Sequence, residues 1–294
     1  MRIVFSIAFV FAALVLSGRV LAADIDWSKV DTALGKTANM QGEVHRYGIP
    51  RSDLQVTLDG VTIKPALALG GWVAFEPAKD GTMLMGDIVL TENEVSPVMS
   101  KLLASGIDIT ALHNHLMRST PATFYMHIRG HGDPVKLATA IREGLKESKT
   151  PFEPAAAPAQ QAKLELDTDK LDQVLGAKGK VNGGVYQFSM PRRDAVTENG
   201  MAAPAPMGTG TAINFQPTGG GKAAIAGDFV VTAEELNPMI AALRENGIEV
   251  VAIHSHMLEE QPRLFFVHFW ANDDALKLVN GLQAALSKMA VTRS

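Results

Sequence analysis

The sequence predicts an α+β fold made of two copies of one unit. The motif HNH at 113–115 returns as HSH at 254–256, and MGDIVLT at 85–91 returns as AGDFVVT at 226–232 at the same spacing. Within each copy, segments with strand-type alternation and segments with helical periodicity follow one another. We therefore expect a tandem duplication of a unit of about 125 residues.

The chain begins with MRIVFSIAFVFAALVLSGRVLA, in which a charged start precedes an apolar run and small residues. This pattern is typical of a secretory signal peptide, and we expect residues 1–22 to be removed. The apolar run is shorter than the roughly 20 residues that a spanning helix needs. The sequence therefore predicts a periplasmic or secreted protein with no membrane anchor after signal removal.

Each copy is expected to be a ferredoxin-like β-α-β-β-α sandwich with an additional N-terminal helix and strands. In the first copy, IDWSKVDTALG at 25–35 predicts that helix, and LQVTL, WVAFEP and TMLMGDIVL predict strands. Thr91 with Glu94, and Thr232 with Glu235, form capping boxes that indicate a helix start. The strands IDITALHNHL and ATFYMHIRG and the helix DPVKLATAIREGLKES follow.

The segment KTPFEPAAAPAQQAK at 149–163 separates the two copies. It is rich in proline, alanine and glutamine and shows no apolar periodicity, which is typical of a solvated linker. We therefore expect a first α+β repeat at 24–148 and a second at 164–294.

Composition excludes several classes of function. The formal net charge of −4 makes the chain a poor nucleic-acid binder, because binding to phosphates needs a basic surface. The sequence contains no cysteine, which excludes disulfides, thiolate metal ligands and lipid attachment through cysteine.

Histidines fall on the two strands that form a hairpin in each copy. His113 and His115 lie two residues apart, so a strand places them on the same face. If His127 on the partner strand lies opposite His115, the middle of the hairpin is Pro121, and the same register in the second copy gives Pro262. Because proline suits a turn, this register brings three imidazoles together in each copy.

Three converging imidazoles predict a transition-metal site, for zinc or copper, in each repeat. The alternative is a hydrogen-bonded histidine cluster that orders the hairpin. His131 is a candidate fourth ligand in the first copy, whereas the equivalent Asn272 is a weaker ligand. The expected ligands are His113, His115, His127, His131, His254, His256 and His268.

Charged residues near these strands suggest further chemistry. Glu259, Glu260 and Arg263 lie on the loop between the histidine strands of the second copy, where a carboxylate could act as a general base and an arginine could stabilise developing charge. The alternative is a solvated, charged hairpin tip. Asp87 and Asp228 either orient an imidazole or occupy a bulge or turn.

The motifs LTENEVSPVM, ALHNHL and FYMHIRGHGD are answered by VTAEELNPMI, AIHSHM and FFVHFWANDD. Their combination resembles the bacterial secreted domain family named after the mycobacterial lipoproteins LppY and LpqO. The resemblance extends over nearly the whole chain after the signal peptide. It implies a family of unknown function, and it carries over no catalytic residue. Because this chain lacks the lipid-bearing cysteine, it does not imply lipid anchoring.

The main hypothesis is an exported protein that binds one transition metal per repeat, for metal handling or metal-dependent chemistry. An alternative is a non-catalytic envelope module that binds a glycan, peptide or protein, with histidines that are only structural. A second alternative is a metal-dependent hydrolase that uses Glu259 or Glu260. The sequence leaves enzymatic activity open, and the expected partners are a metal ion and a small molecule or envelope component.

Overall fold

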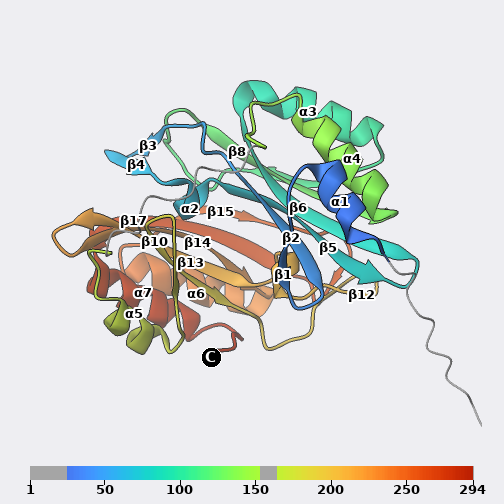
Figure 1. Ribbon diagram of the computed structural model, residues 1–294. Coiled ribbons are helices and arrows are strands. Elements are labelled where there is room, and N and C mark those ends of the chain that lie inside the picture. Colours follow the sequence, from blue (N-terminus) through green and yellow to red (C-terminus); the bar gives the residue numbers. More distant parts are fainter. Residues whose placement is uncertain (1–24, 153–163, 294) are drawn as a thin grey trace, which may run out of the picture.

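A computed structural model describes residues 25–152 and 164–293 and shows two similar α+β units whose sheets face each other (Figure 1). The predicted duplication of an α+β unit is confirmed. The predicted signal peptide at 1–22, and most of the predicted linker at 149–163, lie outside the described residues. None of the helices in the described part of the chain is long and apolar enough to span a membrane.

The first repeat forms a six-stranded antiparallel sheet in the order β1-β2-β5-β6-β8-β7. The order β6, α3, β7, β8, α4 along the chain is the predicted β-α-β-β-α succession. The elements are α1 (Trp27–Leu34), β1 (Asn39–Gln41), β2 (Val44–Pro50), β3 (Val56–Leu58), β4 (Val61–Ile63), α2 (Pro65–Ala68), β5 (Gly70–Ala78), β6 (Gly81–Thr91), α3 (Glu92–Ala104), β7 (Asp108–His113), β8 (Thr123–Gly132) and α4 (Pro134–Leu145).

The second repeat forms an equivalent sheet, in the order β15-β17-β14-β13-β10-β9. An additional small sheet, β12-β11-β16, lies at one end of this repeat. The elements are α5 (Thr168–Leu175), β9 (Lys180–Asn182), β10 (Val185–Met190), β11 (Thr197–Glu198), β12 (Met201–Ala202), η1 (Ala205–Met207), β13 (Thr211–Gly219), β14 (Lys222–Val231), α6 (Ala233–Glu245), β15 (Glu249–His254), β16 (Glu260–Gln261), β17 (Phe265–Asp274) and α7 (Ala275–Leu286).

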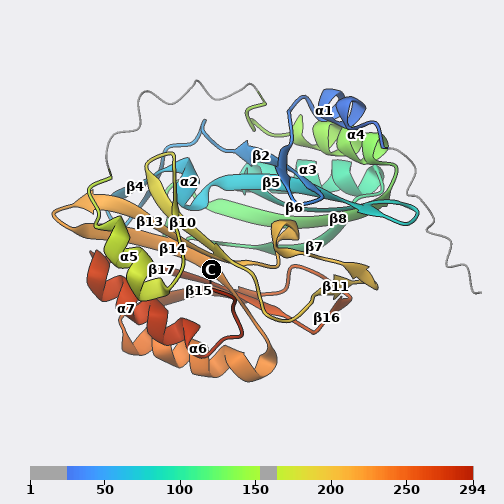
Figure 2. The ribbon, with the colours of Figure 1, turned by 60° about the horizontal axis from the view of Figure 1, so that its bottom comes forward.

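Both faces of each sheet are covered. Both predicted capping boxes are present, at the starts of α3 and α6. On β8, Met126 and Ile128 pack into the core beneath the helices, so that His127 projects from the opposite face. In Figure 2 helices α1, α3 and α4 lie on the outer side of the first sheet and helices α5, α6 and α7 on the outer side of the second, and the inner faces of the sheets meet.

Apolar residues of both repeats pack together where the sheets meet. The β3–β4 hairpin of the first repeat contributes residues such as Val56 and Leu58, which cluster with Ala224 and Trp270 of the second repeat. A second mixed cluster includes Ala74, Met83 and Met85 of the first repeat, and Met207, Met257 and Phe266 of the second. The two repeats therefore share an interior.

The predicted register of the histidine hairpins is wrong. Ala111, rather than His115, lies opposite His127, and His113 lies opposite Tyr125. In the second repeat Ala252 lies opposite His268. The register differs from the prediction by four residues, and because four is an even number every side chain keeps its face.

Candidate metal centre

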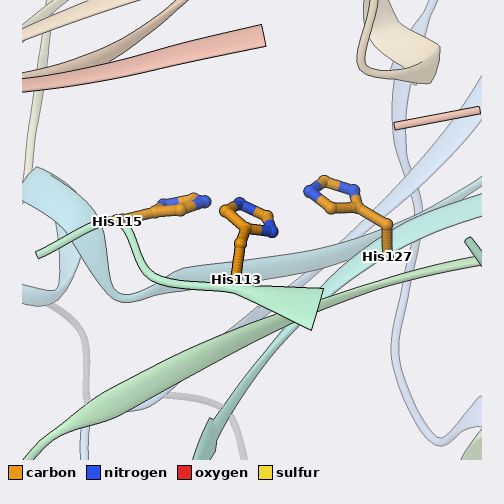
Figure 3. Close-up of side chains that lie close together, drawn as sticks. All are labelled: His113, His115 and His127. Carbon is orange, nitrogen blue, oxygen red and sulfur yellow. The ribbon is translucent and has the colours of Figure 1, made fainter. Parts of the chain in front are cut away.

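Six of the seven predicted histidine ligands meet between the two sheets. Pairs of rings from different repeats lie closest: the centroids of His113 and His254 are 3.5 Å apart, and those of His115 and His268 are 3.7 Å apart. Figure 3 shows how the three histidines of the first repeat lie near one another. The structure therefore joins the two predicted sites into one cluster. We call this the histidine cluster; it comprises His113, His115, His127, His254, His256 and His268, with Asp87 and Asp228.

Adjacent strands of each sheet supply the cluster. In the first sheet, Asp87 on β6 lies opposite His127 on β8. In the second, Asp228 on β14 lies opposite His268 on β17. Both aspartates lie well inside long strands, so the interpretation of these residues as parts of turns is wrong. Residues opposite each other in a sheet share a face, which points each carboxylate toward the imidazoles.

The cluster is approximately two-fold symmetric. The His127 and His256 centroids are 3.8 Å apart, which matches the 3.7 Å between His115 and His268. His115 also stacks on Tyr125, and His256 stacks on Phe266, each with centroids 3.4 Å apart. These aromatic supports fix the planes of the outer imidazoles.

Backbone carbonyls orient two of the rings. His268 Nδ1 lies 2.9 Å from the carbonyl oxygen of Gly227, and His256 Nδ1 lies 3.2 Å from that of Gly208. When Nδ1–H donates to such a carbonyl, the neutral ring keeps its lone pair on Nε2. This is how proteins commonly orient a metal-binding imidazole. The Nε2 atom of His268 already has a neighbour, because it lies 3.1 Å from the Nε2 atom of His113.

Many polar atoms of the histidine cluster are buried without a hydrogen-bond partner. Buried polar atoms in native proteins nearly always have a partner, and each unsatisfied one costs about 1–3 kcal/mol. Their concentration at one place fits a site for a metal ion, which would bind several of them at once. The atoms are Asp87 Oδ1, His113 Nδ1, His115 Nε2, His127 Nε2, Asp228 Oδ1, His254 Nδ1, His254 Nε2 and His256 Nε2.

Four sets of three residues place their ligand atoms within 4.8 Å of one another. Two of the sets combine the two repeats. Nitrogens that share one tetrahedral zinc ion lie about 3.4 Å apart, so the ligand atoms of a set need to approach by at most about 1.4 Å. The residues therefore fit a transition metal. The sets are His113, His115 and His127; His113, His254 and His268; His127, His254 and His256; and Asp228, His256 and His268.

The chain matches the family described as Domain of Unknown Function (DUF1259) over residues 28–147 and again over 169–288. The chain belongs to this family. Each repeat is thus one DUF1259 domain, and the histidine cluster forms where the two domains meet. No curated protein matches the chain.

Two solved structures are similar to the chain at low identity. One is a trimeric bacterial microcompartment shell protein, PduB, with 13% identity over 87% of this chain and 95% of that chain, and a TM-score of 0.22. The other is EtuB from Clostridium kluyveri, with 9% identity over 86% of this chain and 89% of that chain, and a TM-score of 0.18. At these TM-scores neither likeness carries an argument about function.

Burial lowers the pKa values of the imidazoles in the histidine cluster. Burial, followed by the neighbouring imidazoles, lowers the pKa of His113 to about 2 and holds the pKa values of His115 and His127 well below the usual range. The pKa of His254 is lowered for the same reasons. These rings are therefore neutral near pH 7, which is the form that binds metals.

The pKa of Asp87 is shifted in the opposite direction, upward. Burial, followed by repulsion from Asp228, raises the pKa of Asp87 to about 8, although Arg46 counteracts this increase. Arg46 reaches this region from β2, with its guanidinium 3.7 Å from the centroid of the Trp72 ring. Without a metal, Asp87 is therefore a buried acid that holds a proton at neutral pH.

Replacing Asp87 with asparagine is expected to stabilise the metal-free protein by about 1–3 kcal/mol at about pH 9, because the variant buries no unpaired carboxylate. The raised pKa means that this carboxyl group favours the folded state at low pH. That contribution is lost as the pH rises from 3.8 through about 8. The gain should therefore be smaller at about pH 5. Urea unfolding of chelator-treated protein at both pH values measures it. The exposed Asp80→Asn is the control, and a destabilised Asp87→Asn at the higher pH would contradict the expectation.

The three candidate catalytic residues form a network of ion pairs and hydrogen bonds on the loop between β15 and β17. Glu260 is buried and accepts hydrogen bonds from Leu264 N at 3.2 Å and from Arg263 Nη1 at 3.1 Å. Arg263 also donates to Ser255 Oγ, and Glu259 pairs with Arg129 at 3.3 Å. Glu259 N also donates to Glu198, and Arg263 to the carbonyl of Leu258, so within the described ranges these contacts lie outside the histidine cluster.

His131 does not join the histidine cluster. It is exposed near the end of β8, four residues beyond His127, and four strand residues span about 13 Å. The remaining histidine, His45, stacks on Trp27 with centroids 3.4 Å apart. The sequence analysis did not identify the carboxylates of Asp87 and Asp228 as ligands. Asp87 and Asp228 are 141 residues apart, as the matched histidines are, and this spacing could have indicated that they belong to the site.

Proposed function

We propose that the protein binds a transition metal, zinc or copper, in the histidine cluster between its two DUF1259 domains. The observation that carries this proposal is the set of buried imidazole and carboxylate atoms without hydrogen-bond partners. A purely structural cluster would pair these atoms with one another or with the backbone. A metal ion would satisfy several of them at once.

Burial favours metal handling over catalysis on a large substrate. His127 and His268 are 3% and 2% exposed, so little of the cluster faces solvent. Closed sites hold a metal, whereas catalytic zinc sites keep an open position for water or substrate. We propose that the protein is exported and takes part in metal storage, sensing or transfer in the envelope. The resemblance to the LppY and LpqO family is consistent with that location.

The test is the metal content of full-length chain purified without a histidine tag. After chelation, incubation with zinc or copper and desalting, elemental analysis is expected to find at least about one metal per chain. His127→Gln combined with His268→Gln should lose most of this metal, because each residue belongs to two of the four ligand sets. The matched control is His45→Gln, a histidine that stacks on Trp27 outside the cluster. Less than about 0.2 metal per wild-type chain would refute the proposal.

A further inference from the structure

A second group of metal-binding side chains lines a cavity of about 220 Å³ beyond the histidine cluster. The cavity lies between β6 and β8 of the first domain and the β11–β12 segment of the second. Its lining includes the thioethers of Met83, Met85 and Met201 and the imidazole of His131. His131 is exposed, so the cavity is accessible from solvent at that side.

The cavity lies on the same sheet face as the histidine cluster. Met83 lies opposite His131, and Met85 lies opposite Arg129 on the neighbouring strand. The next row on this face is the pair formed by Asp87 and His127. Successive rows on one face are about 7 Å apart, so the cavity extends from the exposed strand end toward the cluster.

Carboxylates give the cavity a negative environment. The guanidinium of Arg129 is 3.2 Å from Asp108, 2.5 Å from Glu198 and 3.3 Å from Glu259. Three carboxylates thus surround a single cation, and Glu198 is only 2% exposed. This excess of negative charge favours the entry of a cation.

The second domain shows that the fold does not require these thioethers. Where the first domain pairs Met83 with His131, the second pairs Ala224 with Asn272. Where the first has Met85, the second has Ala226. The two domains therefore share the histidine cluster, whereas Met83, Met85 and His131 have no thioether or imidazole at the equivalent positions of the second domain.

The methionines of the cavity also pack in the core. Met83 and Met85 belong to the mixed apolar cluster between the domains, and Met201 packs against it. Filling irregular gaps in a core is a common role of methionine. The same three side chains, together with His131, also line the cavity. Thioether sulfur is a soft ligand that suits Cu(I), and imidazole also binds copper, whereas magnesium and calcium prefer oxygen ligands.

We propose that this cavity is a Cu(I) site with Met83, Met85, Met201 and His131 as ligands. The site is separate from the histidine cluster and binds a monovalent soft ion at the solvent-accessible end of the same sheet face. Copper keeps its oxidation state on binding, so no electron transfer is involved.

The experiment uses full-length protein labelled with ¹³C at the methionine methyl groups, and Cu(I) added without oxygen. The methyl signals of Met83, Met85 and Met201, assigned by single Met→Leu substitutions, are expected to shift within the first two equivalents of Cu(I). Signals of Met190, Met239 and Met289, which pack in the core of the second domain, should stay in place. Because the spectra are recorded on the wild-type chain, folding of a variant does not affect this result.

Competition with a chromophoric Cu(I) chelator gives the number of ions bound. The Met83→Leu, Met85→Leu, Met201→Leu triple variant should bind about one Cu(I) fewer than wild type, and its zinc content should be unchanged. The matched control carries leucine at Met190, Met239 and Met289. Unmoved cavity methyl signals, or equal Cu(I) binding by the triple variant and wild type, would overturn the proposal. Loss of metal from the His127→Gln and His268→Gln variant tests the histidine cluster separately.

Discussion

Replacing His254 with glutamine is expected to weaken metal binding by the whole chain more than about 100-fold, since loss of even an outer hydrogen-bond partner of a ligand costs 10–100-fold. His254 lies against His113 at the centre of the cluster. It belongs to two ligand sets, and each of these also uses a histidine of the first domain. A single change in the second domain should therefore affect sites that involve both domains.

Competition against a chromophoric chelator measures this effect, and the matched control is Ser255→Ala. Ser255 is the next residue along the chain, but its hydroxyl accepts a hydrogen bond from Arg263, away from the imidazoles. Two independent sites would lead to a different result. The variant would then lose the metal of the second domain and keep wild-type affinity in the first, and that outcome would contradict a shared centre.

The sequence predicted the hairpins and the shared face of the histidines because both depend on local rules. Alternation along a strand fixes which side chains share a face, and it does so even when the register shifts by an even number of residues. The register itself was mispredicted, because the connection after His113 extends to Thr123, where β8 begins. An irregularity between Ile109 and Ala111 also shifts the pairing along β7.

The sequence did not predict that the two sites merge, because nothing local determines how one domain packs on the other. That arrangement depends on long-range contacts, such as those of the β3–β4 hairpin with Trp270, and of Thr110 Oγ1 with the His256 carbonyl at 2.6 Å. Asp87 was difficult to assign for a similar reason. A carboxylate beside a glycine is typical of a turn, and only the opposing sheet makes its burial evident.

The shared centre also links metal binding to the stability of both domains. Metal at 1,000 times its dissociation constant is expected to stabilise the folded state by about 4 kcal/mol, because the unfolded chain does not assemble the ligands. For a protein of this size each kcal/mol raises Tm by about 2–4 °C, so we expect a total increase of roughly 8–16 °C. Because the proposed centre takes ligands from both domains, the metal-bound chain should unfold in one transition.

Differential scanning calorimetry with and without zinc measures both the shift and the number of transitions. The variant with His127→Gln and His268→Gln should show almost no increase in Tm, whereas the control with His45→Gln should behave like wild type. An equal increase in the cluster variant would place the stabilising metal elsewhere. Two transitions, of which only one responds to zinc, would mean that a single domain binds the metal. A single transition that shifts with zinc in the wild type but not in the cluster variant is the result that the shared centre predicts.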